Sequence, residues 1–248
     1  MNIDGIKDSA NFTIKYESGA NKGKVFLYAD YATVSTNEWT SEQVYAKSKN
    51  VNAIRWDYGR ASTLKTDMEI FDLKWIAMLF GTDFVSGSKD ILKREVLTLD
   101  STKKATMNGT AVTGSLSVYT LDDDGISNLK ELELTSGYTI NEKEITVSAE
   151  AAKEGDKIAV FYLENKTSVK TLTINADKYP ENFEIFADTM IRNQGGDDEF
   201  VQIHYLNLKP KSQFTLTLDA SNITTLSVEF DILKDTASSD MAEYTIYK

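Results

Sequence analysis

Apolar and polar residues alternate with a period of two along much of the chain. The clearest case lies near the C-terminus, where Phe214, Leu216 and Leu218 alternate with polar residues before a turn-like segment at 220–222. A second alternating run follows, with apolar residues at Leu226, Val228, Phe230 and Ile232. Two half-buried strands joined by a short polar connection predict a β-hairpin.

Similar short runs recur through the rest of the sequence. They lie at 12–16, 24–28, 53–58, 95–99, 115–119, 157–163, 170–175, 183–186, 201–206 and 243–247. Ten or more short strands separated by turn residues are typical of an antiparallel β-sandwich or barrel. We therefore predict a mainly β fold.

Residues 66–81 depart from this alternation. Thr66 and Glu69 have the spacing of a capping box, and Gly81 fits a helix C-cap. The residues between them are apolar around most of a helical circumference, which predicts one flanking α-helix that is covered on several sides. A second sheet or a neighbouring subunit would supply this cover.

The middle of the chain reads as a separate unit. It contains alternating apolar positions, an acidic turn at 122–125 and a further turn around Gly155. We predict that residues 101–166 form a small inserted Ig-like β-domain. Residues 1–100 and 167–248 would then form one discontinuous β-sandwich domain.

Composition narrows the choice of function. Among 248 residues there is no cysteine and one histidine, which excludes disulfides, thiol nucleophiles and cysteine metal sites. The chain has 27 Lys and Arg residues and 38 Asp and Glu residues, so its formal net charge is −11. A chain this acidic is a poor candidate for binding nucleic acid, because that affinity comes mainly from cationic contacts to phosphate. We find no apolar run of membrane-spanning length and no leader-like start, and expect a soluble protein of a cytosol-like compartment.

The candidate chemical groups favour structural explanations. His204 lies on the polar side of an alternating strand, and no G-x-S-x-G motif accompanies it. The glycine–acid loop at 195–199 lacks the lysine of a phosphate cradle and is read as an exposed hairpin loop. No pair of carboxylates stands out as a glycosidase site, and we predict no enzyme activity and no cofactor.

The acidic turn at Asp122-Asp123-Asp124-Gly125 resembles part of an EF-hand loop. Thr120 stands where the first ligand should be an Asp, however, and strands flank the turn. We expect a solvated turn and no metal site, with Asp122 and Asp124 kept as weak calcium candidates.

The order of these features resembles the tail tube (major tail) proteins of tailed bacteriophages, in particular those with an Ig-like insertion. The resemblance runs through an extended stretch at 35–50, then Ile54-Arg55-Trp56-Asp57, the helical segment and the inserted unit. It continues with residues 172–186, the turn between Arg192 and Gly196, and the strands up to residue 235. In place of an extended hairpin, Thr40-Ser41-Glu42-Gln43 would also fit the cap of a short helix.

The resemblance implies a virion structural protein whose copies form stacked, hexameric rings around a tape-measure protein. The tube would let DNA pass without specific binding, and it would contact sheath, baseplate or initiator proteins but no membrane. Residues 35–50 would reach the next ring, and the Ig-like unit would face solvent outside. We expect subunit contacts at Asn37, Glu38, Trp39, Trp75, Asp197 and Asp198. Assembly would take place in the bacterial cytoplasm.

Two other classes remain open at this point. One is another virion component, such as a baseplate or head-decoration protein. The other is a β-sandwich module that binds carbohydrate or a surface partner, which would be a monomer with an exposed aromatic patch. Trp39 lies in a polar stretch and fits an interface anchor and a core anchor equally well.

Overall fold

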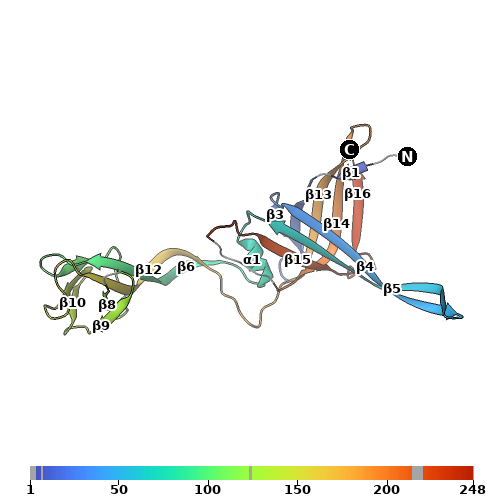
Figure 1. Cartoon of the computed structure of the whole chain (residues 1–248). Helices are drawn as coiled ribbons and strands as arrows, with labels where there is room; N and C mark the ends of the chain where they lie inside the picture. Colours follow the sequence, from blue (N-terminus) through green and yellow to red (C-terminus); the bar gives the residue numbers. More distant parts are fainter. Residues whose placement is uncertain (1–3, 7, 123–124, 214–219, 248) are drawn as a thin grey trace. The chain divides into compact units, whose positions relative to one another are not determined.

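A computed structural model describes residues 4–6, 8–122, 125–213 and 220–247 of the chain (Figure 1). The contacts divide the chain into two compact units. Unit 1 comprises Met1–Phe84 and Leu172–Lys248, and unit 2 comprises Val85–Thr171. The boundaries predicted from the sequence lay at 101 and 166, inside those of unit 2.

Unit 1 is built on one antiparallel sheet. Its strands are β1 (Asp4–Ile6), β2 (Asn11–Tyr16), β3 (Val25–Ala29), β4 (Val34–Ser48), β5 (Val51–Met68), β13 (Phe183–Asn193), β14 (Asp198–Pro210), β15 (Leu226–Ile232) and β16 (Ala242–Tyr247). The main path runs β3-β2-β13-β14-β15-β5-β4, with β1 beside β13 and β16 beside β14. The path ends at β3 and β4, so the sheet is open, not a closed barrel. The mainly β prediction is confirmed.

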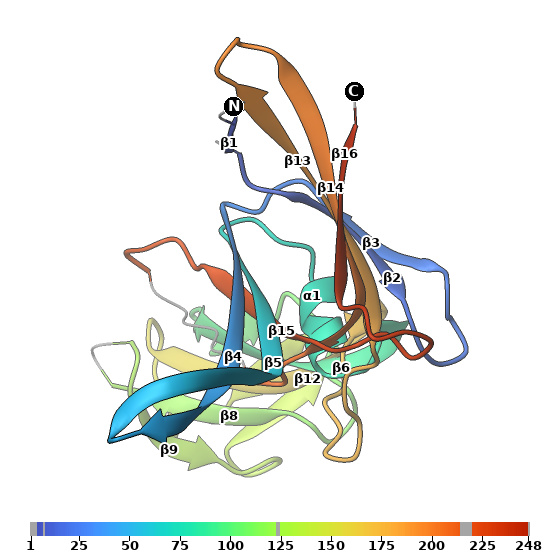
Figure 2. The same ribbon diagram turned by 90° about the vertical axis from the view of Figure 1, so that its right-hand side faces the viewer.

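The core of unit 1 lies between this sheet and one short helix, α1 (Lys74–Leu79) (Figure 2). Alternate residues of the strands point to α1, and the indole of Trp75 lies 6.4 Å from the ring of Phe230. Trp75 is completely buried, and its Nε1 donates a hydrogen bond to the Tyr31 hydroxyl at 3.0 Å. Burial of alternate side chains from six strands explains why period-two patterning dominates the sequence.

The predicted helix at 66–81 was wrong in its extent. Thr66 lies in β5, opposite Val228 of β15, and is buried between Leu64 and Met68 on the core face. The apparent capping box is therefore the end of an alternating strand. The helix begins only at Lys74, whose backbone N–H donates to Asp72 Oδ1 at 2.8 Å.

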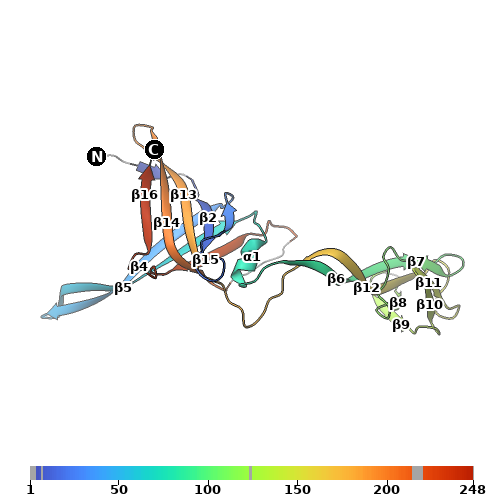
Figure 3. The same ribbon diagram turned by 180° about the vertical axis from the view of Figure 1, so that it is seen from behind.

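Unit 2 is a small sandwich of two antiparallel sheets (Figure 3). One contains β6 (Val85–Thr98), β12 (Lys157–Thr171), β8 (Ser117–Leu121) and β9 (Asn128–Leu132), in that order. The other contains β10 (Tyr138–Asn141), β11 (Glu144–Val147) and β7 (Lys104–Thr106). Apolar side chains from both sheets form one separate core. Its assignment as an Ig-like domain stays a prediction.

A polar contact inside unit 2 fixes a long loop to its sheet. The Tyr162 hydroxyl donates to the Glu95 carboxylate and accepts from the Gly109 N–H at 3.0 Å. Burial, followed by the hydrogen bond to Glu95, raises the pKa of Tyr162 to about 12. The pair therefore holds the 107–116 loop without acting as an acid or base near neutral pH.

Within the described residues, none of the helical segments has the length and apolarity required to cross a membrane.

Candidate assembly surfaces

The first candidate surface is the set of open strand edges in unit 1. The pairing recorded for the described residues ends at β3 and β4, and β1 and β16 flank the β13–β14 hairpin. Such edges present backbone N–H and C=O groups to solvent and are templates for pairing with another chain. β16 also exposes Tyr244, Ile246 and Tyr247, an apolar composition that is unusual for a solvated edge.

The second candidate surface is the long hairpin of β4 and β5, which projects from the sheet (Figure 1). Lys49 and Asn50 form its turn with positive φ values of 49° and 67°, the combination that a two-residue type I′ turn requires. The predicted extended stretch at 35–50 is therefore a strand and its turn. The alternative, a short helix capped at Thr40-Ser41-Glu42-Gln43, was wrong.

The pairing register makes the distal half of this hairpin amphipathic. Opposed residues in an antiparallel pair share a face, and Val44 opposes Trp56 while Ala46 opposes Ile54. With Tyr58, these five residues form what we call the hairpin apolar face. The other face is polar: Tyr45 donates to Gln43 at 2.7 Å, and Arg55 pairs with Asp57 at 3.1 Å.

A bulge explains why the apolar residues gather on one face. Thr40 opposes Ala61, but Glu42 opposes Tyr58, so β5 contains one extra residue near Gly59, which has φ +59°. A one-residue shift exchanges the faces of a strand relative to its neighbour. Beyond the bulge, Ile54, Trp56 and Tyr58 therefore lie opposite the face that carries Asn37 and Trp39.

Asn37 anchors the base of the hairpin to the sheet. Its amide nitrogen donates to Ser62 Oγ at 3.0 Å and to the Thr63 carbonyl at 2.9 Å. Its Oδ1 accepts from Trp39 Nε1 at 2.7 Å, and the hydroxyls of Tyr205 and Tyr244 donate to it at 3.3 and 3.1 Å. Asn37 therefore connects β4, β5, β14 and β16 within one subunit.

Replacing Asn37 with Ala should lower the free energy of unfolding by about 1–3 kcal/mol, because several part-buried polar groups lose their partner. Denaturant unfolding of the monomer measures this change. Glu38→Ala is the matched control, since Glu38 is the exposed neighbour on the other face and should change stability by less than about 0.5 kcal/mol. Equal effects of the two substitutions would contradict the anchoring role.

The sequence-predicted contact residues are dispersed in the structure. Asn37 and Trp39 share one face of β4, and Trp39 lines an open cavity of about 530 Å³ together with Asp57 and Arg60. Glu38 is exposed on the opposite face. Trp75 has no exposed surface, so its side chain does not contact another subunit. The sheet of the same chain covers it, where the sequence had suggested a second sheet or a neighbouring subunit.

Asp197 and Asp198 lie at the tip of the β13–β14 hairpin. Arg192 forms a bidentate pair with Asp198, with distances of 2.5 and 2.7 Å, and this hydrogen bond lowers the pKa of the Asp198 carboxyl. Asp197 closes the turn with Asn193, whose Oδ1 accepts from the Asp197 N–H at 3.0 Å. Both acids therefore help to shape their own turn.

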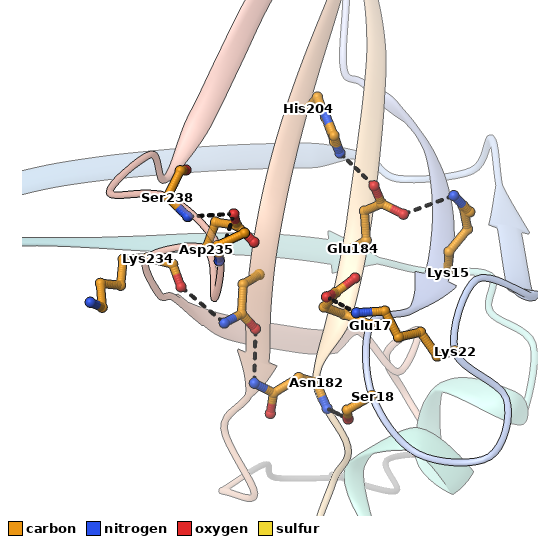
Figure 4. A network of polar contacts seen from close by, with 12 residues as sticks. Lys15, Glu17, Ser18, Lys22, Asn182, Glu184, His204, Lys234, Asp235 and Ser238 are labelled. Carbon is orange, nitrogen blue, oxygen red and sulfur yellow. Dashed lines mark hydrogen bonds and ion pairs between the residues drawn. The ribbon is translucent and has the colours of Figure 1, made fainter.

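The polar face of the sheet contains the histidine of this chain. The His204 ring stacks on Phe186 at 4.1 Å, and its Nε2 lies 2.8 Å from Glu184 Oε1 (Figure 4). Lys15 donates to the same carboxylate at 2.8 Å. Burial opposes ionisation of Glu184, but the hydrogen bonds from Lys15 and His204 outweigh it and leave the pKa of Glu184 below its usual value.

This shift predicts how Glu184 contributes to stability as the pH changes. A carboxylate whose pKa is lowered by folding stabilises the folded state above its ordinary pKa, and this contribution is lost as the pH falls through the lowered value. The stability advantage of the wild type over Glu184→Gln should thus be constant above about pH 5.5 and shrink in more acidic solution. Thermal unfolding of both proteins across this range measures it. An advantage that grew on acidification would contradict the assignment.

Of the two weak calcium candidates, Asp124 lies outside the described residues. Asp122 belongs to the β8–β9 turn, where its carbonyl accepts from the Gly125 N–H at 2.8 Å. Among the residues that the structure describes, no three His, Cys, Asp or Glu side chains are grouped to hold a metal ion.

Comparisons with known proteins agree on one family. The YomU/Tube protein family matches residues 4–246. The chain is also similar to the tail tube protein of Bacillus phage SPR, with 27% identity over 251 residues that cover 96% of this chain and 86% of the phage protein. These matches confirm the resemblance predicted from the sequence.

Proposed function

Because the chain belongs to the YomU/Tube protein family and is similar to a phage tail tube protein, we propose that its copies join into closed rings that stack into the tail tube. The chain is a structural protein of the phage tail, and tube formation by self-assembly follows from its family. The rings, which are hexameric by the resemblance, and their stacking are the proposal.

The observation that carries this proposal is the open sheet of unit 1. Exposed edges on β3, β1 and β16 would be paired if copies joined side by side. The β4–β5 hairpin extends from the same sheet and would give each copy a second, separate contact along the tube. Ring closure by edge pairing and stacking by the hairpin would thus use different surfaces.

The tube would serve as a conduit for DNA ejection. A net charge of −11 per copy suits this task, because like charges prevent tight binding of the phosphate backbone. Assembly would take place in the host cytoplasm around a tape-measure protein, with sheath, baseplate or initiator proteins at the ends. We propose no catalytic role for the chain.

Negative-stain electron microscopy of the purified protein over a concentration series tests the proposal, with mass photometry beside it. Rings or hollow filaments of constant diameter are the expected result. Lys130→Glu, an exposed position in unit 2, is a control that should leave them unchanged. Monomers at every concentration, also after addition of tail-tip complexes from the phage, would contradict the proposal.

A further inference from the structure

The distal hairpin leaves an apolar surface uncovered. Val44, Ile54, Trp56 and Tyr58 are each 50–54% exposed, although they lie side by side on the hairpin apolar face. A continuous stripe of this kind on an otherwise charged chain indicates a surface that is covered by a partner. The polar face of the same hairpin needs no such cover, because its side chains pair with one another.

A second uncovered apolar surface lies on the extension formed by β1, β13, β14 and β16. The register places Ile6 beside Ile191, Val201 beside Ile246, and Ile203 beside Tyr244, all on the side of the sheet that faces the core. We call these six residues the four-strand apolar face. Ile6, Tyr244 and Ile246 are 57–63% exposed, whereas Ile191 and Val201 are nearly buried among them.

A cavity of about 150 Å³ lies at the foot of the four-strand apolar face. It is open to solvent and is lined by apolar side chains, among them Ile6, Phe12 and Ile203, together with polar ones, among them Asp8, Asn37 and Thr189. Apolar cavities of about this volume accept a benzene-sized ring. The cavity therefore offers a place for one aromatic side chain of a partner.

We propose that the hairpin apolar face of one copy packs on the four-strand apolar face of a second copy. Figures 1 and 2 show the hairpin and the β13–β14–β16 extension projecting from unit 1 in different directions, so one copy does not cover its own face. We take a second copy as the partner because the chain self-assembles. Each copy carries both faces, so the hairpin of one copy can cover the four-strand apolar face of the next. A heterologous contact of this kind repeats from copy to copy.

The inference rests on the proposed function, since it needs neighbouring copies, but it adds which surfaces meet. It places Trp56 at the contact, against the four-strand apolar face. It also leaves Arg55 and Asp57 in solvent, because they lie on the other face of the hairpin.

Engineered cysteines test the contact, since the chain has none of its own. Ile54→Cys combined with Ile246→Cys should give a ladder of covalent multimers in assembled tubes when a short bismaleimide is added. Arg55→Cys combined with Ile246→Cys is the matched control, because Arg55 is the next residue but points to the opposite face. The Ile54 pair should crosslink at least about tenfold faster, as side chains of adjacent strand residues point apart.

Fluorescence quenching supplies a readout that needs no thiol. Trp56 is 52% exposed in the single copy, and acrylamide should quench its fluorescence less after assembly. The contribution of Trp56 is obtained as the difference in quenching between the wild type and Trp56→Phe. Tubes that form without this protection, and without faster crosslinking at Ile54, would overturn the inference and leave the proposed function intact. Absence of any assembly would overturn both.

Discussion

A chain in which residues 43–57 are replaced by Asn-Gly should fold like the wild type and form no stacked tubes. Glu42 opposes Tyr58 across the hairpin, so a two-residue type I′ turn can join them directly. The replacement removes most of the hairpin apolar face but keeps Asn37, the bulge at Gly59 and all of the sheet below. Electron microscopy measures assembly, and circular dichroism with thermal unfolding measures the fold.

The expected product of this replacement is a population of monomers or single rings. Thermal unfolding of the monomer should be nearly unchanged, because the removed side chains are exposed and lie outside the core of unit 1. Tubes of normal length would contradict the stacking role of the hairpin. Deletion of all of 35–50 would be a poorer test, since it removes β4 and the Asn37 hydrogen bonds and would unfold the sheet edge.

The sequence predicted the strands well where one face is buried. Leu226, Val228, Phe230 and Ile232 alternate in the sequence and are buried in β15. The partner expected at 214–218 lies outside the described residues. In the structure β15 pairs with β14 and β5. Burial fixes the period of a strand, but its neighbours depend on long-range pairing that no local pattern encodes.

The helix was mispredicted because short apolar runs fit both periods. Leu64, Thr66 and Met68 continue the alternation of β5, yet Thr66 and Glu69 also match a capping box. Thr66 pairs with Val228 of β15, and the same pairing continues to Leu226 and Met68, so β5 remains a strand up to Met68. The capping-box motif at Thr66 and Glu69 is therefore not used as a helix start, because strand pairing between β5 and β15 determines the local structure.

The hairpin apolar face was missed for a different reason. Residues 53–58 were predicted as one of the alternating strands, with Trp56 inside it and no sign of an uncovered apolar face. The bulge at Gly59 changes the face on which these residues lie, and a bulge of one residue leaves only a weak signal in the sequence. Alternation showed that one face is apolar, but not which surface of the molecule would cover it.

Gly81→Ala should lower the free energy of unfolding of unit 1 by about 2–5 kcal/mol, from left-handed backbone strain together with overpacking. Gly81 follows α1 with φ +60°, and a Cβ added there would lie 2.1 Å from the Tyr179 carbonyl oxygen. This contact is with backbone, so relief requires the 172–182 segment to move away from α1. Because α1 carries Trp75, Met78 and Leu79 into the core, the displacement should spread to the whole unit.

Gly23→Ala separates the two causes. Gly23 has φ +80°, but an added Cβ would have no atom within 4 Å, so only the backbone strain of about 1–2 kcal/mol applies. Urea unfolding of the two variants and the wild type measures the difference, with Trp75 fluorescence as the probe of the core. Equal decreases in the free energy of unfolding for the two variants would show that the segment at Tyr179 moves away from the added Cβ without loss of stability. A clearly larger loss at Gly81 would show that the close approach of the two segments fixes α1 on the sheet, and with it the scaffold that supports the assembly surfaces.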